Sequence, residues 1–180
     1  KKLVQQGYEI DFLPDDGVDE AEYIVALAAI GVQAHCGPSV GSHPQWFAEN
    51  HGDYAAVIIS RHHLASYWIP MVRRIAPAMK IVFDTVDLHH LREQREAELH
   101  GNAGMLRSAK ATLRRELASI MLADTTWVVS PVEKAVIQGH ARQAHIEVVP
   151  NLHEVHTETS AYHDRNGMLF VGGGNHPPNV

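Results

Sequence analysis

Short apolar runs that alternate with helical patterns are the feature of this sequence that most constrains its fold. The runs occupy residues 8–13, 32–36, 55–60, 80–84, 126–130 and 146–150. They are continuous and rich in β-branched residues, as is typical of strands that are covered on both faces. The segments between them carry apolar residues at spacings of three and four, as helices do. This alternation predicts an α/β domain with a doubly wound parallel sheet.

Helical patterns fill the segments between the runs. We expect helices over residues 20–30, 44–50, 64–75 and 132–138, and one long helical region before the run at 126–130. An apolar stripe in that region indicates a core-facing side, made of Leu106, Ala109, Leu113, Leu117, Ile120 and Met121. Residues 3–7 are typical of the end of a helix closed by glycine, so we expect the chain to begin inside an element of a longer protein.

The sequence changes character after residue 151. Residues 152–166 are polar and show no periodicity, which indicates a linker. A new strand pattern follows at 168–171 and leads into a glycine-rich segment. We therefore expect one domain over residues 1–151, a linker over 152–166, and the first strand and loop of a truncated second domain over 167–180.

Composition excludes several classes of protein. The formal net charge is -6 and the Lys and Arg residues are scattered, which argues against a nucleic-acid partner. The single cysteine, Cys36, cannot form an internal disulfide, and no apolar run approaches the roughly 18 residues needed to span a bilayer. We expect a cytoplasmic protein. Arg107, Lys110 and Arg114 line one helix face, where they are either solvated or touch the anionic inner face of a membrane.

Polar side chains gather where the run at 80–84 ends. Ligands of doubly wound sheets bind beyond the carboxyl ends of the strands. The junction at 84–93 holds Asp84, Asp87, His89, His90, Arg92 and Glu93. A helix N-terminus offers free N–H groups there and histidine titrates near neutrality, so the junction suits an acceptor hydroxyl or an anion. The structural alternative makes Asp87 an N-cap and pairs Arg92 with Glu96 on a solvated face.

Other polar residues give weaker signals. Ser60 and Arg61, followed by two histidines, end the run at 55–60. Ser130, with Pro131 and with Glu133 three positions after the serine, forms a capping-box pattern that favours a structural role. The densest histidine patch, His153, His156 and His163, has no recognised ligand spacing, and we expect no metal site.

Taken together, these segments resemble the GT-B glycosyltransferases of the family-four type, in particular the bacterial cell-surface and O-antigen polysaccharide group. The resemblance lies in residues 7–16, 60–61, 83–89, 92–97, 123–131, 149–151, 170–173 and 176–179. It implies two Rossmann-like domains that face a cleft, and transfer of a sugar from a nucleotide-sugar donor, with retention, to a glycan or lipid-linked acceptor. It implies no cofactor and no obligatory metal.

The resemblance makes this chain the acceptor-side domain without its opening strand. Asp87 and His89 are the expected catalytic residues, with the division of roles between them open. Expected acceptor contacts are Ser60, Arg61, Asp84, Arg92, Glu93 and Ser130, and expected donor contacts are Gly172, Gly173, Asn175 and His176. Most transition-state contacts would lie in the missing domain, so we expect the 180-residue chain alone to transfer no sugar.

Two other functions share this pattern. Asp15 and Asp16 are similar to the acidic pocket of a flavodoxin-like receiver module, but Ser60 and Arg61 stand where a receiver needs its phospho-accepting aspartate. A GT-B sugar-nucleotide epimerase would share the architecture without glycosyl transfer.

The absent opening strand would leave a gap in the sheet between residues 8–13 and 55–59. Unpaired backbone groups at such a gap are unfavourable beside apolar surface. We therefore expect direct pairing of these two runs, a strand from another copy of the chain such as residues 168–171, or rearrangement of the first two strands.

Overall fold

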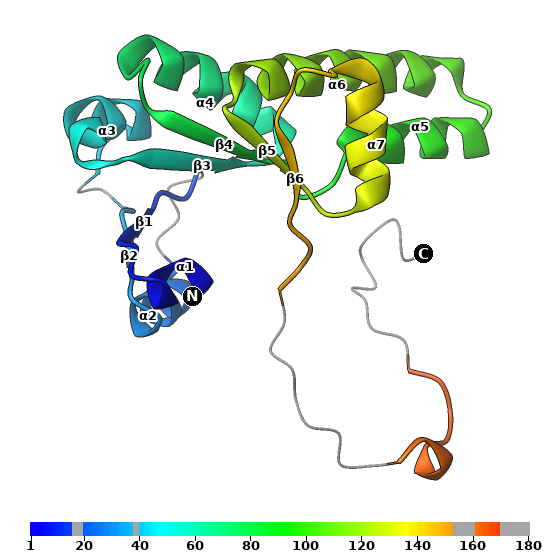
Figure 1. Ribbon diagram of the computed structural model, residues 1–180, viewed down its shortest axis with the longest axis horizontal. Helices are drawn as coiled ribbons and strands as arrows, with labels where there is room; N and C mark the ends of the chain where they lie inside the picture. The colour runs from blue at the N-terminus through cyan, green and yellow to red at the C-terminus, as the bar shows by residue number, and fades with distance from the viewer. Residues whose placement is uncertain (16–19, 38–39, 153–160, 170–180) are drawn as a thin grey trace. The chain divides into compact units, whose positions relative to one another are not determined.

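The computed structural model describes residues 1–15, 20–37, 40–152 and 161–169 (Figure 1). The chain divides into two compact units, Lys1–Pro150 and Asn151–Val180. The first unit is built from parallel strands alternating with helices. The predicted α/β class with parallel pairing is therefore confirmed.

The main sheet has four parallel strands in the order β3-β4-β5-β6. These are β3 (Ala56–Ser60), β4 (Lys80–Asp84), β5 (Thr125–Val128) and β6 (Ile146–Val148). The helices between them are α4 (His62–Ile75), α5 (His89–Leu99), α6 (Ala103–Leu122) and α7 (Pro131–His140). The β-branched runs thus become strands, and the segments of helical spacing become the crossovers that parallel pairing requires.

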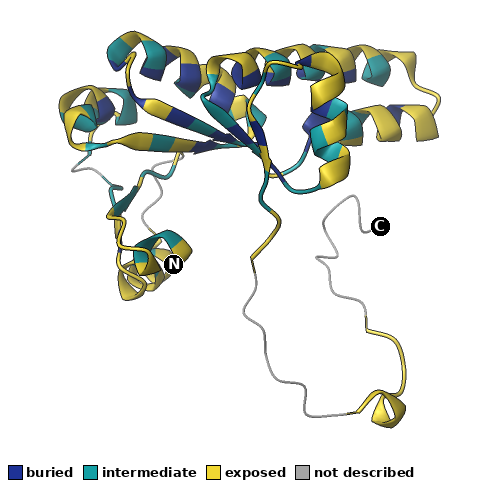
Figure 2. Ribbon diagram, viewed as in Figure 1, coloured by how far each residue is buried: buried dark blue, intermediate teal, exposed yellow. Residues whose placement is uncertain are grey.

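The core lies between this sheet and its helices. Ile81 and Phe83 of β4 are fully buried, and they share a cluster with Ile69 of α4, Ile120 of α6 and Ile137 of α7. Figure 2 shows these buried residues as dark blue segments along β4 and the inner faces of the helices. Each such side chain stabilises the fold by about 1.5–3 kcal/mol relative to an exposed one. Burial of this cluster therefore stabilises the main sheet and its helices.

The long helical region consists of two helices, α5 and α6, and its break was not predicted. Gly101 adopts a φ of +59°, and the Asn102 side chain accepts hydrogen bonds from the N–H groups of Gly104 (2.9 Å) and Met105 (3.2 Å). Asparagine is a favourable N-cap, so this turn ends one helix and starts the next. α6 packs against both α5 and α4. The apolar stripe faces inward as predicted, apart from Met121, which is exposed.

The first two strands form a sheet of their own. β1 (Ile10–Phe12) pairs in parallel with β2 (Val32–Ala34), and α2 (Ala21–Ala29) connects them. β1 does not pair with β3, so the predicted direct pairing of residues 8–13 with 55–59 is wrong. β3 is instead an edge strand among the described residues, and Ile58 in it is half-exposed. Filling of that edge by another copy stays a prediction.

The remaining elements are short. α1 (Lys2–Gln5) is followed by Gly7 at a φ of +90°, as expected for the end of a helix. α3 (His43–Asn50) continues into the 3-10 helix η1 (His51–Asp53). Among the described residues, no helix combines the length and apolar character needed to cross a membrane.

The described part of the second unit contains one 3-10 helix, η2 (Tyr162–Asp164). Met168 and Leu169 are exposed and lie outside any strand, so for these two residues the predicted buried strand is wrong. The rest of that run, 170–171, lies outside the described residues, as do His153 and His156.

Asp124 ties three elements together where β5 begins. Its carboxylate lies 2.6 Å from Arg73 Nη2 of α4 and 3.2 Å from Lys80 Nζ, and it accepts the Ile81 N–H at 2.8 Å. Burial acts to raise the pKa of Asp124, but the hydrogen bonds from Arg73, Ile81 and Lys80 outweigh it and lower the pKa from 3.8 to about 2.

We predict that Asp124→Asn lowers the free energy of unfolding by about 1–2 kcal/mol at pH 7. The folded-state pKa is depressed, so the stabilisation is complete above the unfolded value near 4 and is lost as the pH falls toward 2. Urea unfolding at pH 7, 4 and 3 should show the gap to the unsubstituted chain narrowing. The exposed Glu22→Gln serves as control, and a gap that stays constant with pH would contradict the assignment.

Candidate active site

The carboxyl ends of β3 and β4 meet through Ser60 and Asp84. Ser60 Oγ donates to Asp84 Oδ2 at 3.0 Å, and the Arg61 N–H donates to the Asp84 carbonyl oxygen at 2.9 Å. Asp84 Oδ1 accepts the N–H of Val86, two residues further on, at 3.1 Å. Such Asx turns fix the path of a loop. Ser60 and Asp84 therefore shape the turn after β4.

Two residues at these strand ends have strained backbones. Arg61 has a φ of 74° and Val86 a φ of 64°, the two positive values of non-glycine residues in the described part of the chain. For a β-branched residue this conformation costs on the order of 1–3 kcal/mol. Strain of this kind concentrates at functional sites, which favours the β3 and β4 ends as the place of the chemistry.

Asp87 and His89, the predicted catalytic pair, are in contact. His89 Nδ1 lies 3.0 Å from Asp87 Oδ1, and Arg92 Nε lies 3.6 Å from Asp87 Oδ2. The N-cap of α5 is Leu88, without a side-chain bond, so the alternative of Asp87 as N-cap is wrong. Arg92 pairs with Asp87 rather than with Glu96. A carboxylate at Nδ1 fixes the imidazole tautomer and leaves the other ring nitrogen for chemistry.

A polar pocket of about 310 Å³ opens beside this pair. It is lined by Asp87, Leu88, Leu91, Arg92, Arg95, Ser130, Val132 and Glu133. Two guanidinium groups beside a carboxylate and a hydroxyl suit a ligand that carries both anionic oxygens and hydroxyl groups. Arg95 was not among the predicted contacts, although it lies one turn after Arg92 on the same helix.

Hydrogen bonds of Ser130 and Glu133 stabilise one wall of this pocket. Ser130 Oγ accepts the Glu133 N–H at 3.2 Å, which confirms the serine half of the capping box. The Glu133 carboxylate accepts the N–H groups of Val129 (3.0 Å) and Leu88 (3.3 Å) instead of that of Ser130. It therefore fastens the turn after β5 to the start of α5, and Ser130 serves the fold while it lines the pocket.

Several predicted contacts are not among the residues that line this pocket, Ser60 and Asp84 included. Glu93 accepts a hydrogen bond from Thr112 Oγ1 at 2.7 Å, between α5 and α6, and does not line the pocket. Arg61 is exposed and does not line it either. The predicted donor contacts Gly172, Gly173, Asn175 and His176 fall outside the described residues.

A buried carboxylate that was not predicted lies behind the pocket. Glu116 of α6 is fully buried, and it accepts the N–H groups of His89 (2.8 Å) and His90 (3.4 Å). It also pairs with His90 Nδ1. Glu116 thus caps α5 from another helix. The signal for it in the sequence is a charged residue midway between Thr112 and Ile120, which are both buried on the inner face of α6.

His62, at the start of α4, completes this cluster. Its ring centroid lies 4.4 Å from that of His89, and its Nδ1 is buried without a hydrogen-bond partner. Burial is the main cause that lowers the pKa of His62, and the neighbouring His89 lowers it further. His62 is therefore held in its neutral form.

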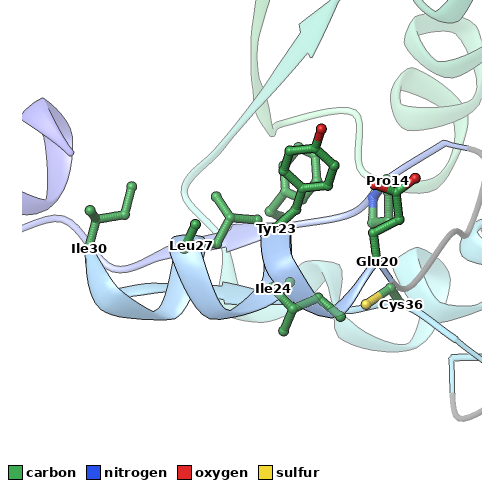
Figure 3. A pocket seen from close by; sticks show the side chains of 10 residues that line it. Pro14, Glu20, Tyr23, Ile24, Leu27, Ile30 and Cys36 are labelled. Carbon is green, nitrogen blue, oxygen red and sulfur yellow. The ribbon is translucent and has the colours of Figure 1, made fainter.

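A second cavity, of about 460 Å³, lies over α2 and the small sheet (Figure 3). Its lining is Phe12, Pro14, Glu20, Tyr23, Ile24, Ala26, Leu27, Ile30, Ala34 and Cys36. This wall is almost wholly apolar, and it lacks the convergent polar groups that orient a substrate. The polar pocket is therefore the better candidate for the active site.

The polar pocket and the buried cluster are linked by Asp87, which lines the pocket and contacts His89, the first residue of α5. Both lie at the turns that follow β3, β4 and β5, where a parallel sheet presents its ligand-binding edge. No protein family, curated protein or solved structure was found to match the chain.

Proposed function

We propose that this chain is the acceptor-side domain of a retaining glycosyltransferase in bacterial surface polysaccharide synthesis. The enzyme would move a sugar from a nucleotide-sugar donor to a glycan or lipid-linked acceptor. The observation that carries the proposal is the contact of Asp87 with His89 and Arg92 at the mouth of the polar pocket. The motifs of the family-four type, described above from the sequence, support the choice of reaction.

The chemistry of the pocket fits this reaction. Sugar transfer passes through an oxocarbenium-like transition state, which a nearby carboxylate stabilises. Asp87 is partly exposed and supplies that charge, while it also orients the imidazole of His89. His89 would hold the Asp87 carboxylate in position beside an acceptor hydroxyl, and positioning alone contributes a large part of such a barrier.

Arg92 and Arg95 are the proposed contacts to the acceptor. Guanidinium groups bind phosphate oxygens in bidentate fashion, as a lipid-linked phosphate acceptor would require. Arg107, Lys110 and Arg114 are exposed on α6, where they would hold the protein against anionic lipids on the cytoplasmic face of the membrane.

We predict that Arg95→Ala raises the KM for the acceptor by about tenfold to a hundredfold in the complete protein that carries this sequence, with little change in kcat. The assay follows label from a panel of nucleotide sugars into lipid-phosphate acceptors. The exposed Arg142→Ala is the matched control. Failure of every donor to transfer would contradict the proposal, and conversion of a nucleotide sugar without any acceptor would favour the epimerase.

A further inference from the structure

We propose that His62, His89 and Glu116 form a binding site for a divalent transition-metal ion, with Zn²⁺ as the ion that fits best. The proposal concerns binding alone and does not rest on the proposed glycosyl transfer. One ligand atom from each of the three side chains lies within 4.8 Å of the others. The three residues come from the starts of α4 and α5 and from the middle of α6.

The distances between the three ligand atoms allow the side chains to close around a metal ion. Zinc binds imidazole nitrogen and carboxylate oxygen at about 2.0–2.2 Å, so tetrahedral ligand atoms lie roughly 3.4 Å apart. Ligand atoms within 4.8 Å of one another reach this spacing when side chains move by about an ångström. Rotation of His62 achieves much of this movement, because no hydrogen bond holds its Nδ1.

The cluster already has the second layer of contacts that metal ligands need. Ligating histidines usually direct their other ring nitrogen at a carboxylate, which fixes the orientation of the ring. His89 Nδ1 lies 3.0 Å from Asp87 Oδ1 and 3.9 Å from Glu116 Oε1, so two carboxylates hold the ring in place. Ligating carboxylates are themselves hydrogen-bonded, and Glu116 accepts the N–H groups of His89 and His90. Two of the three ligands are therefore held in place without the ion.

The metal also accounts for an atom that the fold leaves without a partner. A buried polar group without a hydrogen bond costs about 1–3 kcal/mol, and His62 Nδ1 is such a group. The pairing of Glu116 with His90 explains the buried carboxylate, but it leaves His62 unexplained.

The ligand set selects the class of ion. Two imidazoles and one carboxylate suit zinc and other late first-row ions, whereas Mg²⁺ and Ca²⁺ prefer oxygen ligands alone. Three protein ligands leave a fourth position open, as in zinc sites that bind water or a substrate oxygen.

The test is zinc binding by the purified chain after treatment with a chelator and dialysis. Calorimetric titration with ZnCl₂ should show one tight site per chain, and elemental analysis should give the same stoichiometry. His62→Ala should weaken binding by at least about a hundredfold, and Asp87→Ala by about tenfold to a hundredfold through His89. MgCl₂ at the same concentrations should give no heat of binding.

The exposed neighbour His63→Ala is the matched control and should bind zinc as the unsubstituted chain does. Circular dichroism checks the fold of His62→Ala, and His62→Gln replaces it if the alanine variant unfolds. Unchanged affinity in a folded His62 variant overturns the proposal. So does loss of the tight site when His153, His156 and His163 are replaced together. Sugar is absent throughout, so failure here is distinct from failure of the proposed transfer reaction.

Discussion

Replacing Glu116 with alanine is expected to lower the free energy of unfolding by about 3–5 kcal/mol, the usual cost of breaking a buried charged pair. Glu116 is fully buried, and it caps the first turn of α5 through the N–H groups of His89 and His90. The alanine variant leaves both donors and the His90 ring buried without this acceptor. Urea unfolding followed by circular dichroism, with chelator present to exclude bound metal, measures the effect.

Two further variants serve as comparisons for that stability measurement. Glu116→Gln keeps one acceptor oxygen and the side-chain volume, so its loss should be smaller than that of the alanine variant. Glu96→Ala lies on the exposed side of α5 and should change stability by less than about 0.5 kcal/mol. A loss below about 1 kcal/mol in Glu116→Ala would show that α5 is capped by other groups.

Asp87→Asn and His89→Gln are each expected to lower sugar turnover by about a hundredfold or more in the complete protein. The Asp87 carboxylate contacts both His89 and Arg92, so the asparagine variant removes charge while it keeps shape. Initial rates at saturating donor and acceptor measure the effect. The melting temperature should change little in Asp87→Asn, because that side chain is partly exposed and forms no helix cap.

The control for this pair is Glu147→Gln, an exposed carboxylate of β6 that pairs with His145. Its turnover should equal that of the unsubstituted protein. Near-normal turnover in both Asp87→Asn and His89→Gln would show that neither residue contributes to catalysis.

The strands could be predicted from the sequence because each is a continuous apolar run bounded by turn-forming residues. β4 covers the predicted residues 80–84, and β1 pairs with β2 as the doubly wound order requires. The junction after β4 could also be predicted, since ligand-binding residues follow strand ends. These features depend on residues that are close together in the sequence, and the spacing of apolar residues reveals such local structure.

The buried cluster could not be predicted, because its members meet only through the packing of three helices. Glu116 and His89 are 27 positions apart, and no spacing rule links them. The structural alternative for the junction at 84–93 is wrong for the same reason. Local rules gave Asp87 the cap and gave Arg92 the partner Glu96, whereas Glu116 supplies the cap and Asp87 takes Arg92.

The capping of α5 by the Glu116 carboxylate has a consequence for the order in which the helices fold. The first turn of α5 is complete only when α6 has docked, because its acceptor belongs to α6. The first turn of α5 therefore stays without this cap in a nascent chain that has released only residues 1–100. Conversely, local opening of the α5 and α6 hairpin would expose the amides of His89 and His90 to hydrogen exchange together, and would dismantle the pocket while the strands remain paired.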